Sequence, residues 1–217
     1  MNINFIWIGE VVPPPFIDNY KTCARLNPHH TVRLFRDHDL DSLTKEFGIF
    51  DIYKKINLVN RVNLAKYLTL HYFPGLYSDV DIIWHKPVDE LLRQPVNRFY
   101  DGCLWPNFNK IHKDPEFISC VRPYLYVYKG EKVYIFDDHL VYATTDGIWK
   151  AIKYMQGKWL NKKFNPLIQF EPFGPVSITE MVYDNNLKAN MWFDPQCQAK
   201  GQFCTHTSMR LWDGIPM

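Results

Sequence analysis

The sequence has almost no excess of charge of either sign. Its 25 lysine and arginine residues are balanced by 23 aspartate and glutamate residues, which gives a formal net charge of +2. So small an excess gives no reason to expect a polyanionic partner, and we do not expect nucleic acid. The hydrophobic content of 47% and the charged content of 22% are ordinary for a globular protein.

Long hydrophobic runs are also missing. The stretch Met1–Gly9 has no basic region, and its apolar part is too short for a signal peptide or a membrane span. No linker or internal repeat interrupts the 217 residues, a length that suits one domain with a sizeable core. We therefore expect a single domain over 1–217 without a membrane segment, either alone or as one domain of a longer protein.

Cysteine is scarce and shows no pattern. The five residues are Cys23, Cys103, Cys120, Cys197 and Cys204. An odd number without the spacing of a disulfide framework favours reduced thiols and a cytoplasmic protein. A zinc site at Cys197, Cys204 and His206 is not expected, because their spacing matches no common zinc pattern.

What is present centres on Gly75–Trp84, a β-prone run that carries two aspartates. Pro74 and Gly75 end any preceding helix, and the aromatic and β-branched residues of the run favour a strand. In an extended backbone Asp79 and Asp81 point the same way, about 6.5–7 Å apart at the backbone. Two carboxylates without an adjacent thiolate or second histidine favour a hard ion, Mg²⁺ or Mn²⁺.

The spacing of these two carboxylates is not specific by itself. Asp-x-Asp also occurs at 37–39 and 39–41, where the surroundings are those of a helix start. The copy at Asp79 and Asp81 differs because burying two carboxylates among apolar residues is costly unless a positive group neutralises them. A solvated strand end is the alternative interpretation.

Strand and helix patterns alternate along the chain. Strands are expected at 2–9, 31–36, 75–84, 99–105, 121–128 and 131–142, and helices at 16–26, 40–47, 52–73, 87–92, 147–156 and from 174 onward. Asp37 or Asp39 can cap the second helix. The alternation predicts an α/β fold with a mostly parallel sheet flanked by helices. Ligands bind such sheets at the carboxyl ends of the strands, where Gly9, Asp79 and Asp81 all occur.

Several separated segments resemble the DXD-dependent glycosyltransferases of the GT-A fold, and they occur in the order found in that family. The segments are Phe5–Gly9, Asn27-Pro28 with Val32–Phe35, Asn63-x-x-Lys66-Tyr67, Gly75–Asp81, Phe173–Pro175 and the tail with His206 and Trp212. The similar group includes the yeast Golgi mannosyltransferase-like family, the glucosylating clostridial toxins and, above all, the small glycosyltransferases of large algal (chlorella) viruses. The resemblance implies a single GT-A (Rossmann-like) domain.

The resemblance also implies roles for particular residues. The donor-binding residues would be Ile6, Trp7, Gly9, Asn63, Lys66, Tyr77, Asp79, Arg210 and Trp212. Trp7 would stack on uracil, for which an indole face is suited, although a core tryptophan is the alternative. Asp79 and Asp81 would hold Mn²⁺ or Mg²⁺ at the diphosphate of the donor, and His206 would complete the metal shell.

Two helix positions depart from the resembled family, whose members commonly have Asp and Arg where this chain has Asn63 and Lys66. An asparagine side chain donates as well as accepts hydrogen bonds, and lysine lacks the two-pronged guanidinium. The donor sugar can therefore differ. We expect UDP as the nucleotide and leave glucose and a deoxyhexose such as rhamnose both open.

The predicted function is transfer of a hexosyl group from a UDP-sugar to a carbohydrate hydroxyl of a glycan acceptor, with the retained configuration that the resemblance implies. Asp137, Asp138 and His139 interrupt a β-like run where relatives line the acceptor side, which makes them the catalytic candidates; an ordinary turn is the alternative. Two other functions stay open, a non-catalytic sugar-binding module and a metal-dependent phosphoesterase. The expected location is cytoplasmic, in the host cytoplasm for a viral protein.

Overall fold

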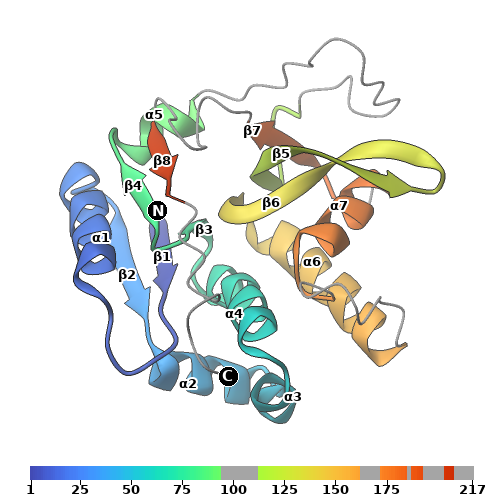
Figure 1. The fold of residues 1–217 in the computed structure, drawn as a ribbon, viewed down its shortest axis with the longest axis horizontal. Helices are drawn as coiled ribbons and strands as arrows, with labels where there is room; N and C mark the ends of the chain where they lie inside the picture. The colour runs from blue at the N-terminus through green and yellow to red at the C-terminus, as the bar shows by residue number, and fades with distance from the viewer. Residues whose placement is uncertain (94–111, 162–171, 185–186, 193–202, 208–217) are drawn as a thin grey trace.

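A computed structural model describes residues 1–93, 112–161, 172–184, 187–192 and 203–207 (Figure 1). The first elements in chain order are β1 Asn2–Ile6, α1 Pro14–Leu26, β2 Thr31–Phe35, α2 Asp37–Glu46, α3 Phe50–Lys55, α4 Leu58–Tyr72, β3 Gly75–Ser78, β4 Ile82–Trp84 and α5 Val88–Leu92. They are followed by β5 Phe117–Tyr128, β6 Glu131–Ala143, α6 Thr145–Leu160, α7 Pro175–Tyr183, β7 Ala189–Trp192 and β8 Cys204–His206.

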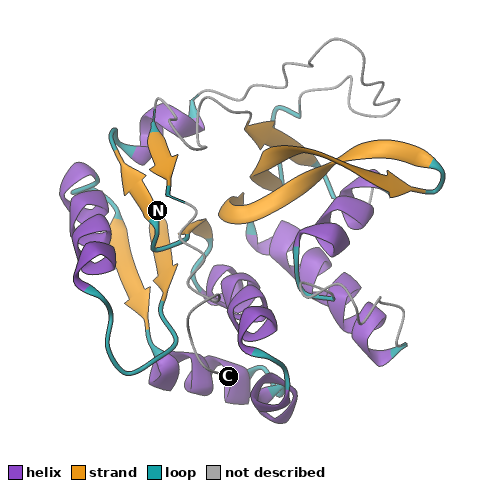
Figure 2. Cartoon of the chain, viewed as in Figure 1, coloured by secondary structure: helices purple, strands orange, loops and turns teal. Residues whose placement is uncertain are grey.

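The main sheet has six strands in the order β2-β1-β3-β6-β5-β7. Strand β1 pairs in parallel with β2 and β3, β7 pairs in parallel with β5, and β6 runs antiparallel to both β3 and β5. Strands β4 and β8 form a separate antiparallel pair. Figure 2 shows these strands with helices around them, so the predicted α/β fold with a mostly parallel sheet is confirmed.

Side chains that alternate along the central strands build two hydrophobic cores. Leu76 of β3 belongs to the core shared with α1, β4, α5 and β8, whereas Tyr77 belongs to the core shared with α2, α3, α4, α6 and α7. Because neighbouring side chains of a strand point to opposite faces, one short strand contributes to both cores. Asp79, two residues after Tyr77, therefore directly follows a strand that is buried on both faces.

The prediction of one strand over 75–84 is wrong. Strand β3 ends at Ser78, the chain turns, and β4 begins at Ile82 in the other sheet. The amide of Ile82 donates to the carbonyl of Asp79 at 3.2 Å within this turn. The turn brings the buried carboxylates next to Lys66 and His206, which offset the cost of their burial.

The predicted helix over 52–73 is also wrong, because it is two helices. Asn57 caps α4 by accepting a hydrogen bond from the amide of Asn60 at 2.9 Å, so the chain breaks after α3. Helix α2 is capped at Arg36, whose amide donates to Asp39 at 2.8 Å, rather than at either predicted aspartate. The predicted strand at 99–105 lies outside the described residues.

Strand β6 runs without interruption through 137–139, so the predicted interruption there is wrong. Its pairing with β5 does shift: Ser119 pairs with Val141, but the next residue, Cys120, pairs with Asp137. The segment between these partners, 138–140, bulges out of the β5 ladder. Bulges of this kind change the direction of side chains and are frequent beside active sites.

The described cysteines differ from one another. Cys23 and Cys204 are free and buried, and burial raises the pKa of each thiol to about 12. Cys120 is disulfide-bonded, so the prediction of reduced thiols is wrong for this residue. Within the described ranges, no helix has the length and apolar character to cross a membrane.

Gly75 provides a test of how β3 is seated. Its φ is +145°, and a methyl group there would overlap the backbone oxygen of Asn2 in the neighbouring strand. We expect Gly75→Ala to lower the free energy of unfolding by at least about 2 kcal/mol, measured by urea denaturation. Gly157→Ala in α6 is the control: its methyl group meets open space, so a stabilisation of up to about 1 kcal/mol is expected. Equal effects of the two substitutions would contradict the close approach of β1 and β3.

Candidate functional site

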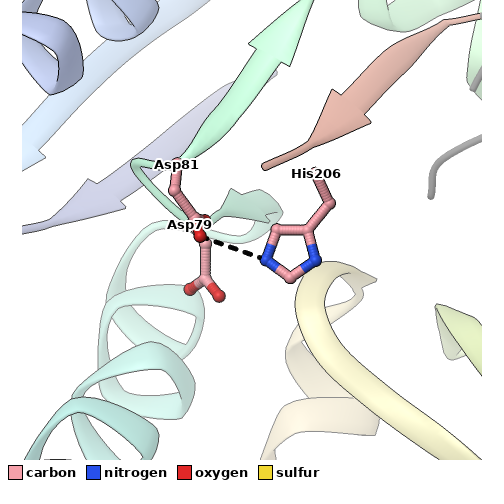
Figure 3. Close-up of side chains that lie close together, drawn as sticks. All are labelled: Asp79, Asp81 and His206. Atoms are coloured by element: carbon pink, nitrogen blue, oxygen red, sulfur yellow. Dashed lines mark ion pairs between the residues drawn. The ribbon is translucent and has the colours of Figure 1, made fainter. Parts of the chain in front are cut away.

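Asp79, Asp81 and His206 form a group whose ligand atoms all lie within 4.8 Å of one another. Figure 3 shows the two aspartates in the turn between β3 and β4, with the His206 ring turned toward them from the end of β8. His206 Nε2 lies 3.3 Å from an oxygen of Asp81. The sequence prediction that these residues act together thus has a geometric basis, although through a turn rather than an extended strand.

Three parts of the structure hold this turn in place. The Asp79 amide donates to the carbonyl of His139 in β6 at 2.8 Å. The Asp81 carbonyl accepts from the Thr207 amide at 3.1 Å and from its hydroxyl at 2.8 Å, and the Asn19 side chain of α1 donates to the Val80 carbonyl at 2.9 Å. Both sheets and α1 therefore fix the backbone that carries the two carboxylates.

Lys66 of α4 is the cation of this site. Its ammonium lies 3.4 Å from Asp79 and 3.3 Å from Asp138, and its side chain is only 5% exposed. Burial works against its charge, but Asp138, Asp79 and Asp137 outweigh burial, so the pKa of Lys66 is raised. Lys66 therefore stays protonated and joins α4, the turn between β3 and β4, and β6.

Opposing effects act on the pKa of the Asp79 carboxyl. Burial raises the pKa of its carboxyl, Lys66 opposes this, and the neighbouring Asp81 and Asp138 raise it further. The hydroxyl of Tyr77 donates to Asp79 at 2.6 Å, and burial keeps the pKa of that phenol well above its ordinary value. A neutral phenol and an ammonium thus both orient this carboxylate.

Three buried polar atoms without a hydrogen-bond partner among the described residues belong to the helix and the strand whose residues Lys66 and Asp138 form this ion pair. They are Nδ2 of Asn63, the hydroxyl of Tyr67 and Oδ2 of Asp138. Burial raises the pKa of Tyr67 well above 10, with Asp138 as the next contribution, so its hydroxyl is a neutral donor close to that carboxylate. Because buried polar groups are almost always paired, such a group of atoms indicates a place for a polar ligand.

Tyr67 is a site residue that the sequence analysis did not select, although it quoted the residue within a motif. A signal was available, because Tyr67 directly follows Lys66 and lies four positions after Asn63, on the same helical face as that asparagine. The contacts of Asn19 and Thr207 with the turn had no such signal.

The end of β1 forms another part of the predicted donor site. Trp7 is half-buried, its ring centroid lies 5.4 Å from that of Phe16, and its Nε1 has no partner among the described residues. The Gly9 amide donates to Asp37 at 2.8 Å. Ile6 is 4% exposed, so its side chain belongs to the hydrophobic core at this end of β1.

The other predicted residues have different positions. Asp137 and His139 are each 2% exposed and Asp138 is 8% exposed, all on β6. Asp137 Oδ2 lies 2.8 Å from Nδ1 of His139. Arg210 and Trp212 lie outside the described residues, so their donor-binding role stays a prediction.

Comparison with known proteins agrees with this geometry. Residues 13–97 match the family model described as "Glycosyltransferase sugar-binding region containing DXD motif", and this range contains Asp79 and Asp81. The resemblance to DXD glycosyltransferases is therefore confirmed for the segment that supplies the two carboxylates and Lys66. No curated protein matches the sequence.

Solved structures show a similar fold. The chain is similar to "PaToxG Glycosyltransferase", with a TM-score of 0.53 and 16% sequence identity over 85% of this chain and 69% of that one. The catalytic domain of alpha-toxin from Clostridium novyi has a TM-score of 0.48 and 10% identity, over 74% of this chain and 58% of that one. The likeness to PaToxG, which concerns the fold alone, agrees with the GT-A-like α/β fold expected from the sequence.

Lys66→Met tests the central ion pairs. The substitution leaves two carboxylates without their cation, so we expect the free energy of unfolding to fall by about 3 kcal/mol at pH 7.5. The pKa of Asp79 then rises further, and the carboxyl takes up a proton as the pH falls, so the loss relative to the wild type shrinks at pH 5. Urea denaturation at both pH values measures this.

The matched control is Lys54→Met. Lys54 lies 2.6 Å from Asp41 in a partly exposed pair, with 39% and 28% of the side chains exposed, so its loss costs at most about 1 kcal/mol. The role of Lys66 as the cation of the site would be contradicted if Lys66→Met lowered the free energy of unfolding no more than Lys54→Met does. A loss for Lys66→Met that is the same at both pH values would also contradict it.

Proposed function

We propose that this protein transfers a hexosyl group from a UDP-sugar to a hydroxyl of a carbohydrate acceptor, and that it needs a divalent metal ion to do so. The observation that carries the proposal is a group of two carboxylates and an imidazole, together with unpartnered buried polar atoms on the helix and the strand whose residues Lys66 and Asp138 form the ion pair. The family match supports the general class, and the choice of UDP rests on the sequence resemblance.

The residues present fit a hard divalent ion. Asp79 and Asp81 offer carboxylate oxygens, His206 offers an imidazole nitrogen, and all three can converge on one centre. We propose Mn²⁺ or Mg²⁺ as the ion. When bound, such an ion stabilises the negative charge that grows on a departing diphosphate. Lys66 favours the ionised form of Asp79 against burial, and the hydroxyl of Tyr77 donates a hydrogen bond to this carboxylate.

The nucleotide would lie along the end of β1. Trp7 would provide a face on which a uracil ring stacks, and Gly9 would let the chain pass close to the ligand without a side chain. The Trp7 ring is already held in position by Phe16. Arg210 and Trp212 belong to the same proposal, as further contacts to the donor.

The donor sugar would lie between α4 and β6. Asn63, Tyr67 and Asp138 each have a buried polar atom to offer to its hydroxyls, with Lys66 among them. A sugar that pairs all three atoms is favoured over one that leaves a buried group unpaired, which costs about 1–3 kcal/mol per group. Glucose and a deoxyhexose such as rhamnose both remain donors to test.

The acceptor would approach the side of the site that β6 forms. Of the triplet on this strand, Asp138 is the residue whose side chain faces Lys66 and has an unpartnered oxygen, so it is our first acceptor-side candidate. The catalytic roles of Asp137 and His139 remain predictions. Retention of the anomeric configuration is also proposed, and the product's anomeric proton coupling, measured by NMR, tests it.

Asp81→Asn tests the metal site. The variant keeps the shape of the side chain but loses a charged oxygen ligand, so we expect calorimetry to show no Mn²⁺-dependent UDP binding. Asp41→Asn is the matched control, because Asp41 belongs to another Asp-x-Asp copy and pairs with Lys54 instead. It should bind UDP and Mn²⁺ like the wild type. Full metal-dependent binding by Asp81→Asn would rule the site out.

Trp7→Ala tests base stacking. Loss of a stacked base costs about 1–3 kcal/mol, so we expect UDP affinity to fall by about 5- to 150-fold. The same factor is expected for every UDP-sugar, because the base is common to all of them. The measurement is calorimetric titration with UDP, UDP-glucose and uridine. Unchanged uridine affinity would retire the stacking role.

A panel of UDP-sugars decides between donors and between functions. A ligand that binds the folded state raises the melting temperature according to its affinity, so the donor gives the largest shift with Mn²⁺ present and little without it. Slow hydrolysis of that UDP-sugar without acceptor supports a transferase. Sugar binding that needs neither UDP nor metal indicates a sugar-binding module, and phosphate release from simple phosphoesters indicates a phosphoesterase.

A further inference from the structure

His139 contacts both arms of the candidate metal site. Its carbonyl accepts the hydrogen bond from the Asp79 amide at 2.8 Å, which extends the pairing of β3 with β6 beyond Ser78. Its imidazole stacks on the ring of His206, with 4.4 Å between the ring centroids and 4° between the planes. One residue therefore touches two candidate ligands that lie far apart in the sequence.

Asp137 lies against the His139 ring. Its Oδ2 lies 2.8 Å from Nδ1 of His139, and both side chains are only 2% exposed. The backbone carbonyl of Asp137 in turn accepts a hydrogen bond from the hydroxyl of Ser119 in β5. The contact between Asp137 and His139 has an ion-pair distance without the alignment of a hydrogen bond, so it packs the buried carboxylate against the ring.

The bulge in β6 explains how these groups reach the site. Because Ser119 pairs with Val141 while Cys120 pairs with Asp137, residues 138–140 have no counterpart on β5. The displaced segment still pairs with β3 through Leu140 and Ser78. In the sequence this bulge looks like a polar interruption of the strand. In the structure it places His139 beside the end of β3.

We propose that His139 is a positioning residue that builds the metal site: its backbone places Asp79 and its ring sets the plane of His206. The inference rests on the proposed metal-dependent function. At 2% exposure, beneath the His206 ring, His139 acts through that ligand rather than by touching the acceptor. Positioning partners of this kind typically change metal affinity by about 10- to 100-fold.

The test is Mn²⁺ binding without donor or turnover, followed by the electron paramagnetic resonance signal of free Mn²⁺. In His139→Leu the flat ring is lost, and we expect Mn²⁺ to bind about 10- to 100-fold more weakly, with the fold verified by circular dichroism. In His139→Phe a flat ring remains over His206, so affinity should be recovered to within about tenfold of the wild type. A core histidine with a merely structural role would alter the melting temperature of both variants and the Mn²⁺ affinity of neither.

His30→Leu is the matched control. His30 forms a similar contact with a carboxylate, 2.9 Å from its Nε2 to Asp89, but between α5 and the loop after α1. Its loss should leave the Mn²⁺ affinity unchanged. An equal loss of affinity in this variant would show a general effect of unfolding and would overturn the inference.

A second readout needs no variant. In the metal-free wild type, the ring current of His139 should shift the His206 ring protons upfield from their random-coil values in NMR spectra. Unshifted His206 protons would overturn the stack even if His139→Leu did not fold. If the wild type itself binds no Mn²⁺, with or without UDP, the proposed function fails; if it binds Mn²⁺ and His139→Leu binds equally well, only this inference fails.

Discussion

The arrangement of the site depends on one buried lysine between two carboxylates. Asp79 follows β3, whereas Asp138 belongs to β6. Without a cation, the two buried carboxylates would repel each other and would lose their hydration uncompensated. The ammonium of Lys66, 3.4 Å and 3.3 Å from them, makes this proximity tolerable. Since α4 is packed into the hydrophobic core over most of its length, the lysine is delivered as part of a rigid element. The hydrophobic packing of α4 thus offsets the free-energy cost of burying these charges together.

The sheet topology places the other components. Strand β3 is short, but it pairs with β1 on one side and with β6 on the other, so residues from three distant parts of the chain meet where it ends. Trp7 follows β1, Asp79 follows β3, and the bulged part of β6 lies opposite. A mixed sheet is essential here, because the antiparallel β6 approaches from the opposite direction and brings the middle of a strand to the place where β3 stops.

Much of the fold was predictable from sequence because the signals are local. The strand at 31–36 and the helix at 16–26 have clear periodicity and clear ends, and β2 and α1 lie within about two residues of them. The two errors at 52–73 and 75–84 have a common cause, since an apolar pattern does not show where a backbone bends. A single cap at Asn57 divides one pattern, and the change of sheet after Ser78 divides the other.

The site was predictable only in part, for a related reason. Asp79, Asp81 and His206 could be selected as ligand types, but their meeting depends on the pairing of β4 with β8, which no local pattern shows. The buried state of Asp137 and His139 was equally hidden, because polar residues in a strand usually indicate a turn or an exposed face. The bulge, which is a property of two strands together, makes their burial possible.

The pairing of β4 with β8 has a consequence for how the end of the chain is held. Thr207, next to His206, bonds to Asp81 across 126 positions of sequence, and β8 itself is only three residues long. So short a strand is a weak attachment, and any ion shared by Asp81 and His206 would act as a clasp that closes this long loop. Binding of an ion at the site and docking of β8 are then linked equilibria, in which each favours the other to the same extent.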